Sequence, residues 1–431
     1  MFDDGQRSLR HRVTTARRGF LRGVGAVTAG LASSVIADRA QGKRSTTGRS
    51  LYTPPATTPK PGAMYPRVTR LSRDSSGSPV LLATFEHYRS TMAEHAEKPY
   101  FPVYRSKNGG RTWRKVSEIH DTETNWGLRY QPTLFELPRA TGPWEAGTVL
   151  AAGNLVPDDL SGTQIVLYAS EDHGRTWKYV STVATGGRAV PTDGADPVWE
   201  PELELDADGN LVCYFSDERH KDQGYDQLLT HKRSLDGGLT WESQTFDVAM
   251  ADGVPGRRPG MPVVQRLPTG TYVMTYEIVR HRHGAVYIRT SPDGLDWGDP
   301  TAMGTPVTTP DGRYLANGPY VTWTPRGSDG GTLLVSGKTL RNPDGTQAPG
   351  SGSTMLAASS PTDDWATVQS PLRYDDEIET GDLYVGWTSP LVVLNNHVLE
   401  MTSTYLPEQD LCEIRYAKRP LTQHGSEQTP W

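Results

Sequence analysis

Six short segments, each with a proline at its second position, recur along this chain at nearly constant spacing. They constrain its fold more than any other feature. The prolines run from Pro66 to Pro390, with successive spacings of 66, 69, 61, 57 and 71 residues. Self-similarity at a period of this size is the signature of a repeat architecture. The segments are YPRVTRL from Tyr65, QPTLFEL from Gln131, EPELEL from Glu200, MPVVQRL from Met261, GPYVTW from Gly318 and SPLVVL from Ser389. We therefore expect one structural unit to be repeated six times.

Each proline-opened segment is followed by a turn and a second apolar run. The runs alternate apolar and polar residues, which is typical of half-buried β-strands, and no convincing helical stretch interrupts them. With 44 Gly and 33 Pro among 431 residues, the chain is also well supplied with turn residues. The second runs end at Glu86, Asn154, Asp217, Glu277, Lys338 and near Tyr405. The sequence therefore predicts an all-β fold.

A second motif, Ser-x-Asp/Asn-x-Gly-x-Thr-Trp, follows the same period. It occurs at residues 106–113, 170–177 and 234–241, in a shorter form at 291–297 and in a degenerate form at 359–365. Every residue in it can help to build a turn: the Asp or Asn bonds turn amides, the Gly takes a positive φ and the Trp packs beneath. We interpret the motif as a structural hairpin staple rather than as a ligand site.

These motifs resemble the Asp-boxes of the sialidase-like propellers, and the resemblance spans nearly all of the chain after residue 60. It implies a six-bladed β-propeller in which the proline-opened segments are the innermost strands. We assign the propeller to residues 61–420, a linker with a ring-closing strand around Leu51 to Pro54 to residues 41–60, and a tail to residues 421–431. A closed propeller leaves only short, protected edges, so we expect a monomer.

The first forty residues have the pattern of an export signal. Arg17 and Arg18 precede a mildly apolar run, residues 23–37, which is too short and too rich in Gly for a membrane anchor. The pattern resembles a twin-arginine signal, which implies removal of residues 1–40 and a secreted protein outside a bacterial cytoplasm. A basic, mobile N-terminus is the alternative interpretation.

The net charge and the cysteine content argue against nucleic-acid binding and against a metal site. The net charge of −6 offers no basic field for a nucleic-acid partner. Cys213 and Cys412 are the only cysteines, they lack metal-ligand spacing, and a disulfide between them is left open. His281 and His283 fit a loop better than a metal site, so we expect no metal and no cofactor.

The shared register of the repeats predicts which side chains gather at one mouth of the central channel. In an antiparallel meander, the start of the first strand and the end of the second lie on the same rim. Glu200 is the only acidic residue directly before a repeat proline, and Glu277 ends the second strand of the next blade. Two carboxylates on one rim are what glycoside hydrolysis requires. Glu86 and Asp217 also end second strands, so we expect them at the same level of the channel, or tier, as Glu277. Register alone therefore does not choose among the three.

Three segments, DPVWEPELELDADGNLVCYFSDER, RRPGMPVVQRLPTGTYVMTYE and MYPRVTRL, resemble glycoside hydrolase family 93, the exo-α-1,5-L-arabinanases. The resemblance implies an enzyme that cleaves linear arabinan from a chain end and releases arabinobiose with retention. It also implies catalytic glutamates at Glu200, in a Trp-Glu-Pro motif, and at Glu277, in a Thr-Tyr-Glu motif. A tyrosine contributes in the family; Tyr384 is the candidate here and Tyr374 the alternative.

The roles of the two glutamates follow from a further likeness. EPELEL is similar to the strand that carries the glutamate supporting the nucleophile in sialidases, so we expect Glu200 to be the nucleophile and Glu277 the acid/base. A retaining mechanism then requires carboxyl groups about 5–5.5 Å apart and a raised pKa for Glu277. The candidates for substrate binding are Arg67, Arg129, Arg258, Trp199, Asp217 and Tyr276.

Two other functions are consistent with the same residues. A sialidase clamps its substrate carboxylate with three arginines; Arg67, Arg129 and Arg258 could form an anion site, although Arg67 follows the proline that the first sialidase arginine precedes. A non-catalytic carbohydrate-binding propeller needs aromatic platforms and no acid pair. In the favoured interpretation the partner is an arabinan polysaccharide or oligosaccharide, and loops such as residues 94–100 set the choice of substrate.

Overall fold

The computed structural model describes residues 47–72, 79–88, 98–191, 194–251, 256–327, 330–374 and 384–421. Residues Ser45–Trp431 form one compact unit. The signal expected at residues 1–40, and the tail expected at 421–431 except its first residue, lie outside the described residues. No helix in the described ranges is long and apolar enough to cross a bilayer.

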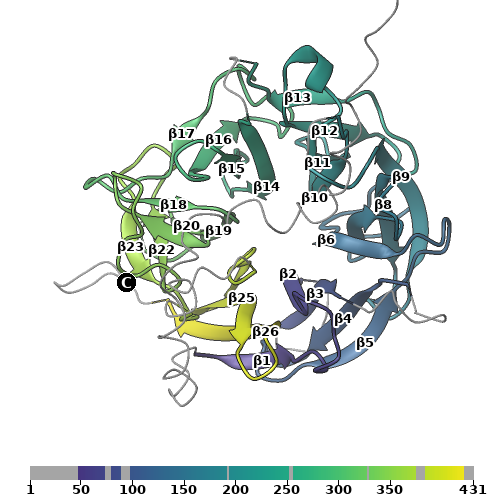
Figure 1. Ribbon diagram of the computed structural model, residues 1–431, viewed down its shortest axis with the longest axis horizontal. Coiled ribbons are helices and arrows are strands. Elements are labelled where there is room, and N and C mark those ends of the chain that lie inside the picture. The colour runs from purple at the N-terminus through teal and green to yellow at the C-terminus, as the bar shows by residue number, and fades with distance from the viewer. Residues whose placement is uncertain are drawn as a thin grey trace, which may run out of the picture. The chain divides into compact units, whose positions relative to one another are not determined.

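Six four-stranded antiparallel sheets surround a central axis as the blades of a propeller (Figure 1), which confirms the expected all-β, six-bladed fold. Each proline-opened segment provides the innermost strand of its sheet, and each innermost strand contacts the next one around the ring. The one helical element among the described residues is a short 3-10 turn, η1, at Lys221–Gln223.

Within each blade the four strands are ordered from the axis outward. The first two sheets contain β2 (Ala63–Leu71), β3 (Val80–His87), β4 (Phe101–Ser106) and β5 (Arg114–Ile119), then β6 (Leu128–Glu136), β7 (Val149–Leu155), β8 (Thr163–Ser170) and β9 (Lys178–Gly186). The next two contain β10 (Val198–Leu205), β11 (Leu211–Asp217), β12 (Leu228–Ser234) and β13 (Thr245–Val248), then β14 (Arg258–Arg266), β15 (Tyr272–Val279), β16 (Val286–Ser291) and β17 (Thr305–Pro306). The last two contain β19 (Tyr320–Thr324), β20 (Thr332–Ser336), β22 (Thr354–Ala358) and β23 (Ala366–Gln369), then β24 (Leu391–Leu394), β25 (His397–Leu406), β26 (Leu411–Pro420) and β1 (Arg49–Tyr52). A separate two-stranded sheet pairs β18 (Tyr314–Ala316) with β21 (Thr339–Arg341).

The ring is closed by a strand from the start of the chain. β1 pairs antiparallel with β26, with Arg49 opposite Tyr416, close to where the sequence placed a ring-closing strand. The first and the last strand of the chain therefore belong to the same sheet. Backbone hydrogen bonds between them hold the ring shut, which leaves only short sheet edges.

The innermost strands of the first four sheets carry a β-bulge at the repeat proline. The register shifts there, so that two residues of the inner strand oppose one of its partner. The residue before each proline has a positive φ, 51° at Tyr65, 56° at Gln131, 60° at Glu200 and 57° at Met261. A left-handed backbone costs a non-glycine residue roughly 1–2 kcal/mol, so the surrounding packing must maintain it. A bulge redirects the side chain that it carries, which is how one backbone device presents a different residue in each repeat.

The sixth repeat differs from the proline-based register by one residue. Gly318, in the fifth repeat, has the positive φ expected directly before its proline, at 57°. In the sixth repeat the positive φ falls on Thr388, at 52°, and not on Ser389 as the proline spacing predicts. The proline marks the start of the strand in this sheet but not the position of the bend.

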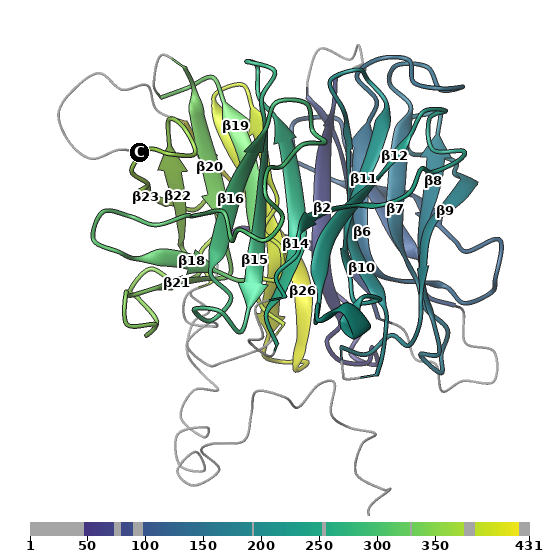
Figure 2. The same ribbon diagram turned by 90° about the horizontal axis from the view of Figure 1, so that it is seen from above.

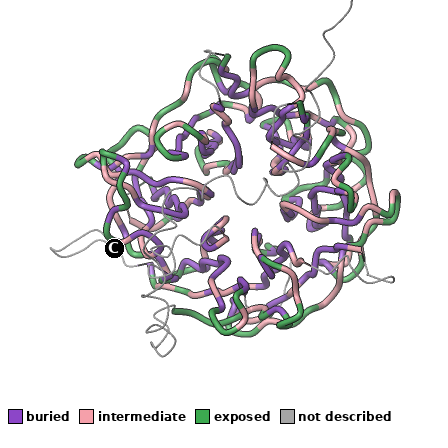
Figure 3. The backbone as a smooth tube through the Cα atoms, in the orientation of Figure 1, coloured by how far each residue is buried: buried purple, intermediate pink, exposed green. Residues whose placement is uncertain are grey.

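The hydrophobic core is divided among the interfaces between adjacent sheets. Each interface has its own cluster of buried apolar side chains, as where Val212 of β11 packs with Met274 of β15. Every residue of β7 and of β11 is buried, although alternation predicted half-buried strands. The reason is that a sheet with neighbours on both sides has no solvent face. Figure 3 shows exposure mainly along the outer edge of the ring.

The Ser-x-Asp/Asn-x-Gly-x-Thr-Trp motif builds turns, as its composition predicted, and it also joins neighbouring sheets. In the copy at residues 170–177, the Asp172 carboxylate accepts backbone N–H groups of Arg175 and Thr176, each at 2.9 Å. Trp177 then donates its indole N–H to Ser117 Oγ of the preceding sheet at 3.0 Å. In this copy the motif therefore links two neighbouring sheets as well as building its own hairpin.

Neither cysteine takes part in a disulfide. Cys213 and Cys412 are described, buried and separate from each other. A buried thiol packs as a small apolar side chain, which is the role that we assign to Cys213 in β11.

Candidate active site

The two glutamates expected to carry the chemistry come together between the third and fourth sheets. The Glu200 carboxylate of β10 accepts the backbone N–H of Met261 in β14. The residue before Met261, Gly260, lies directly opposite Glu277 of β15. Figure 2 shows the inner strands of these sheets running through the depth of the ring. The register therefore places both carboxylates on the same stretch of β14.

Glu200 is partly exposed and held by one of its two carboxylate oxygens. Oε2 accepts hydrogen bonds from Ser216 Oγ and from Met261 N, both at 2.7 Å. Oε1 has no hydrogen-bond partner among the described residues. Burial raises the pKa of Glu200, while the two hydrogen bonds and the charge of Arg258 oppose that rise. This arrangement fixes the carboxylate and leaves one oxygen for chemistry.

Glu277 is more deeply buried, with 4% of its surface exposed. Its Oε2 accepts the backbone N–H of Gly318 at 3.0 Å and Nδ2 of Asn317 at 3.2 Å, and Oε1 has no partner in the described part of the chain. Burial and then the charge of Glu200 raise the pKa of Glu277 to about 7. Near neutral pH this group can therefore both donate and accept a proton, as a general acid/base must.

A third carboxylate, Glu86, lies in the same tier as Glu277. It is 2% exposed, and it accepts the Gln131 N–H at 2.7 Å and the Tyr88 hydroxyl at 3.2 Å. Burial raises its pKa to about 8, with the charge of Glu200 as a smaller cause in the same direction. The sequence placed Glu86 on this rim, and only the structure shows that its surroundings match those of Glu277.

A shared backbone requirement explains why polar side chains recur on this rim. The bulge takes the N–H of the residue before the proline out of its own sheet, so a side chain of the preceding sheet must accept it. Glu86 accepts the N–H of Gln131, and Gln131 Oε1 accepts that of Glu200 at 3.1 Å. The same pattern joins Glu200 to Met261 and Glu277 to Gly318. These carboxylates therefore serve the fold as well as the chemistry.

Asp217 is not the equivalent of Glu277, which corrects the register inferred from the sequence. Glu86 pairs with Met64 and Glu277 with Gly260, whereas the residue paired with Trp199 at the same level is Ser216. In the third repeat Ser216 therefore holds the position of Glu277, and Asp217 lies one residue beyond it. Since neighbouring residues of a strand point to opposite faces, this single offset turns Asp217 away from Glu200.

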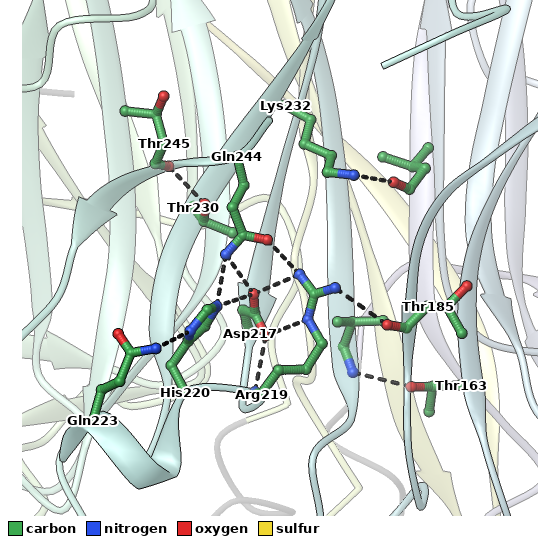
Figure 4. A network of polar contacts seen from close by, with 12 residues as sticks. Thr163, Thr185, Asp217, Arg219, His220, Gln223, Thr230, Lys232, Gln244 and Thr245 are labelled. Carbon is green, nitrogen blue, oxygen red and sulfur yellow. Dashed lines mark hydrogen bonds and ion pairs between the residues drawn. The ribbon is translucent and has the colours of Figure 1, made fainter. Parts of the chain in front are cut away.

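Asp217 instead anchors the turn after β11 (Figure 4). Its carboxylate accepts hydrogen bonds from Nε and Nη2 of Arg219 at 2.9 and 2.7 Å and from Nε2 of Gln244 at 3.1 Å. Burial would raise the pKa of Asp217, but the Arg219 contacts hold it below its ordinary value. The structure assigns this residue to support of the rim and not to a substrate contact.

Arg258 and Trp199 are brought to the site by a buried glutamate that the sequence did not single out. Glu218, 1% exposed, accepts Arg258 Nη2 at 2.5 Å and the Trp199 indole N–H at 2.9 Å. The charge of Arg258 lowers the pKa of both Glu200 and Glu277. These two of the predicted binding residues therefore do lie beside the carboxylate pair.

Arg67 lies deeper in the channel than the catalytic pair. It is 3% exposed, its Nη2 is 3.7 Å from the Glu202 carboxylate, and its guanidinium lies 5.2 and 5.4 Å from the rings of Tyr65 and Tyr320. These partners belong to the innermost strands of the first, third and fifth sheets. Arg67 thus crosses the channel below the rim, where it joins three blades.

Two other predicted binding residues lie away from the carboxylates. Arg129 pairs with Asp158, Nη2 to Oδ1 at 2.7 Å, on the second sheet. Tyr276 is fully buried and donates its hydroxyl to the Met303 carbonyl at 2.5 Å. Tyr276 is adjacent to Glu277 in β15, so the alternation of the strand turns it into the core between sheets.

The two candidate assisting tyrosines, Tyr384 and Tyr374, pack in one cluster, where Tyr384 is half-buried. Burial raises the pKa of Tyr88, with smaller contributions from the charges of its hydrogen-bond partner Glu86 and of Tyr384. Tyr374 is 2% exposed, with its hydroxyl 3.4 Å from Ser389 Oγ. Tyr384 is therefore the more exposed of the two, and its assisting role stays a prediction.

Among the described residues, no group of His, Cys, Asp and Glu side chains is arranged to hold a metal ion. The polar cluster described above consists of carboxylates, phenols, amides, a serine hydroxyl and the Arg258 guanidinium. Such a cluster can transfer protons and form a covalent ester with a substrate.

Comparison with known proteins identifies the family. No family model and no curated protein matches the chain. A Penicillium chrysogenum α-L-arabinanase complexed with arabinobiose is 32% identical, with a TM-score of 0.74, and the match covers 87% of this chain and 98% of that one. The GH93 α-L-arabinofuranosidase of Fusarium graminearum with arabinobiose is also 32% identical, with a TM-score of 0.70 and the same coverage, 87% and 98%.

This chain belongs to glycoside hydrolase family 93. The resemblance on three sequence segments is thereby confirmed, and the protein is a glycosidase. A Hadza microbial sialidase shares the fold alone, at 17% identity and a TM-score of 0.52 over 83% of this chain and 66% of that one.

Tyr65 is a further residue of this family 93 site that sequence reasoning did not select. It is 4% exposed, and its hydroxyl has no hydrogen-bond partner among the described residues. Burial raises its pKa, and the charge of Glu200 is the next cause. Its position before the first repeat proline was a usable signal, because the same position in the third repeat holds Glu200.

Gly260 lies beside both Glu200 and Glu277, and we expect Gly260→Ala to disable this family 93 site. A Cβ there would lie 2.6 Å from Gln227 Nε2 and 3.2 Å from Glu200 Oε2. We expect kcat/KM to fall about 10²-fold through displaced catalytic groups and the free energy of unfolding to fall by about 1–3 kcal/mol. Kinetics and thermal unfolding measure the two effects. Gly330→Ala, with nothing within 4 Å of its Cβ, is the matched control; equal behaviour of the two variants would contradict the packing argument.

Proposed function

We propose that this glycosidase is a secreted, retaining exo-enzyme that hydrolyses linear α-1,5-L-arabinan from a chain end and releases arabinobiose. The observation that carries the proposal is the pair of carboxylates, Glu200 and Glu277, on one stretch of β14, each with one oxygen fixed and one without a partner in the described chain. The solved family members at 32% identity, one of them an arabinanase, are both complexed with arabinobiose, which supports the substrate class.

The two carboxylates are suited to different roles in this reaction. Glu277 donates its proton to the glycosidic oxygen while Oε1 of Glu200 attacks the anomeric carbon, so the glycosidic bond breaks and an ester forms. Glu277 then takes a proton from water, whose oxygen attacks the same carbon and releases Glu200. The raised pKa of Glu277, about 7, suits the acid. The hydrogen bonds that Glu200 accepts from Ser216 and Met261, together with the charge of Arg258, favour its anion.

Two observations bear on exo action and on the rival functions. Arg67 and its partners cross the channel, which supports a substrate that enters from one mouth only. The three arginines that a sialidase would need lie beside three different carboxylates, Glu202, Asp158 and Glu218, in separate parts of the ring. That separation favours a neutral sugar over a sialic acid.

Product analysis tests the proposal. We expect culture supernatant of cells expressing the full chain, but not washed cells, to release arabinobiose alone from linear arabinan, with retained anomeric configuration early in the reaction. Glu200→Ala and Glu277→Ala are the inactive controls, and sialyllactose is the control substrate. A ladder of oligosaccharides would overturn the exo claim, an inverted product the retaining claim, and cell-bound activity the secretion claim. Release of sialic acid instead would favour the sialidase, and binding without release a carbohydrate-binding propeller.

A further inference from the structure

A second pocket, of about 290 Å³, lies on the first sheet. It is formed by β3, β4 and β5 together with the segment that follows β1. Its side chains include five rings with polar tips and one lysine: Tyr52, His87, Tyr88, Tyr100, Tyr104 and Lys115. The catalytic glutamates are not among its lining residues.

The pocket has the chemistry of a site for a neutral sugar. His87 and Tyr100 pack edge to face at 4.8 Å between ring centroids, and the Lys115 ammonium lies 5.2 Å from the Tyr100 ring. Such rings cover apolar C–H surface while hydroxyl and ammonium groups bond sugar hydroxyls. Lys115 is already paired with Glu118, so the pocket offers no uncompensated cation to an acidic ligand.

A path of aromatic rings connects this pocket to the catalytic residues. Tyr88 lines the pocket and also donates its hydroxyl to Glu86 on the rim. Ring centroids are 6.3 Å apart between Tyr88 and Tyr130, and again 6.3 Å apart between Tyr130 and Trp199. Trp199 directly precedes Glu200. A row of three neighbouring rings, Tyr88, Tyr130 and Trp199, therefore leads from the pocket to the residue before Glu200.

We propose that this pocket is a second saccharide-binding site, which holds a remote part of the same neutral polysaccharide chain that is cleaved at Glu200. The inference rests on the proposed function. It adds a physical reason for the enzyme to prefer a polymer over a short oligosaccharide. The pocket contributes affinity for the chain and takes no part in bond cleavage.

Filling the pocket tests this proposal without removing core side chains. Thr57 is exposed and lines the pocket, so Thr57→Trp places a large ring in it. In the inactive Glu200→Ala background we expect linear arabinan to bind about tenfold more weakly, the effect of losing roughly one stacked ring, and arabinotriose to bind unchanged. Lys115→Met, which removes the ammonium but keeps the length, is expected to act in the same direction. Thr269→Trp, exposed on the fourth sheet, is the matched control.

The same substitutions in the active enzyme separate this proposal from the proposed function. We expect a raised KM for the polymer, with kcat and arabinotriose hydrolysis unchanged. If Thr57→Trp binds the polymer as tightly as its parent while the wild-type chain cleaves arabinan, the second site is overturned and the proposed function stands. Absence of arabinan cleavage by the wild-type chain would overturn the proposed function, and absence of arabinan binding with it would overturn both.

Discussion

Replacing Glu200 with alanine is expected to lower kcat on arabinan by about 10⁴-fold or more, because the ester intermediate can no longer form. The variant loses the acceptor of Ser216 Oγ and of Met261 N, and an unsatisfied buried donor costs about 1–3 kcal/mol. Glu200→Gln keeps a side-chain oxygen at this place and is the control for that structural loss. The measurements are steady-state kinetics and thermal unfolding of both variants.

Azide distinguishes the two roles that Glu200 could have. If Glu200 is the nucleophile, azide should occupy the space left in Glu200→Ala and attack the anomeric carbon directly. An activated aryl arabinoside would then yield a glycosyl azide of inverted configuration. A glycosyl azide of retained configuration would show that Glu200 is the acid/base instead and that our assignment of roles is reversed.

Replacing Glu277 with glutamine is expected to lower kcat/KM on arabinan by about 10²–10⁴-fold, since no proton is then delivered to the leaving oxygen. An aryl arabinoside, whose leaving group needs little protonation, should lose much less. Burial and the charge of Glu200 raise the pKa of Glu277 to about 7, so the wild-type rate should fall as pH rises through about 7. In Glu277→Gln this alkaline limb should disappear, because no group remains there to lose the proton.

Glu86→Gln is the matched control for the pH profile, because Glu86 has the same residue type, tier and degree of burial as Glu277. Burial also raises its pKa, to about 8, so its removal tests whether any buried rim carboxylate produces the limb. We expect the alkaline limb near 7 to survive in Glu86→Gln. A limb that vanishes in Glu86→Gln and persists in Glu277→Gln would transfer the acid/base role to Glu86.

The residues that sequence could identify are those whose position follows from the repeat itself. Glu200 precedes a repeat proline, and Glu277 lies two residues before the end of the second strand β15, so the repeat period places both residues. The turn motif is equally local, because Asp172 bonds amides only three and four residues away. In each case the physical cause lies within a few residues or within one repeat.

At Asp217 and Ser389 the register inferred from the sequence was wrong by one residue. Asp217 and Ser216 are neighbours, and only the observed pairing of Trp199 with Ser216 shows which of them faces Glu200. A one-residue shift reverses the face of every side chain that follows. Thr388, which takes the bend expected at Ser389, has the same explanation.

The sequence alone determined the six-bladed ring, the pair Glu200 and Glu277, and the membership in family 93, because period, strand pattern and motif are properties of the chain read in order. Only the tertiary structure decided which cations face these carboxylates, that Glu86 and Tyr65 share their surroundings, and that Arg67 meets Glu202 and Tyr320 across the channel. Glu200 with Met261 and Arg67 with Tyr320 are contacts of this kind, between residues 61 and 253 positions apart. They exist only because the ring closes, and no local pattern records which blades then face one another.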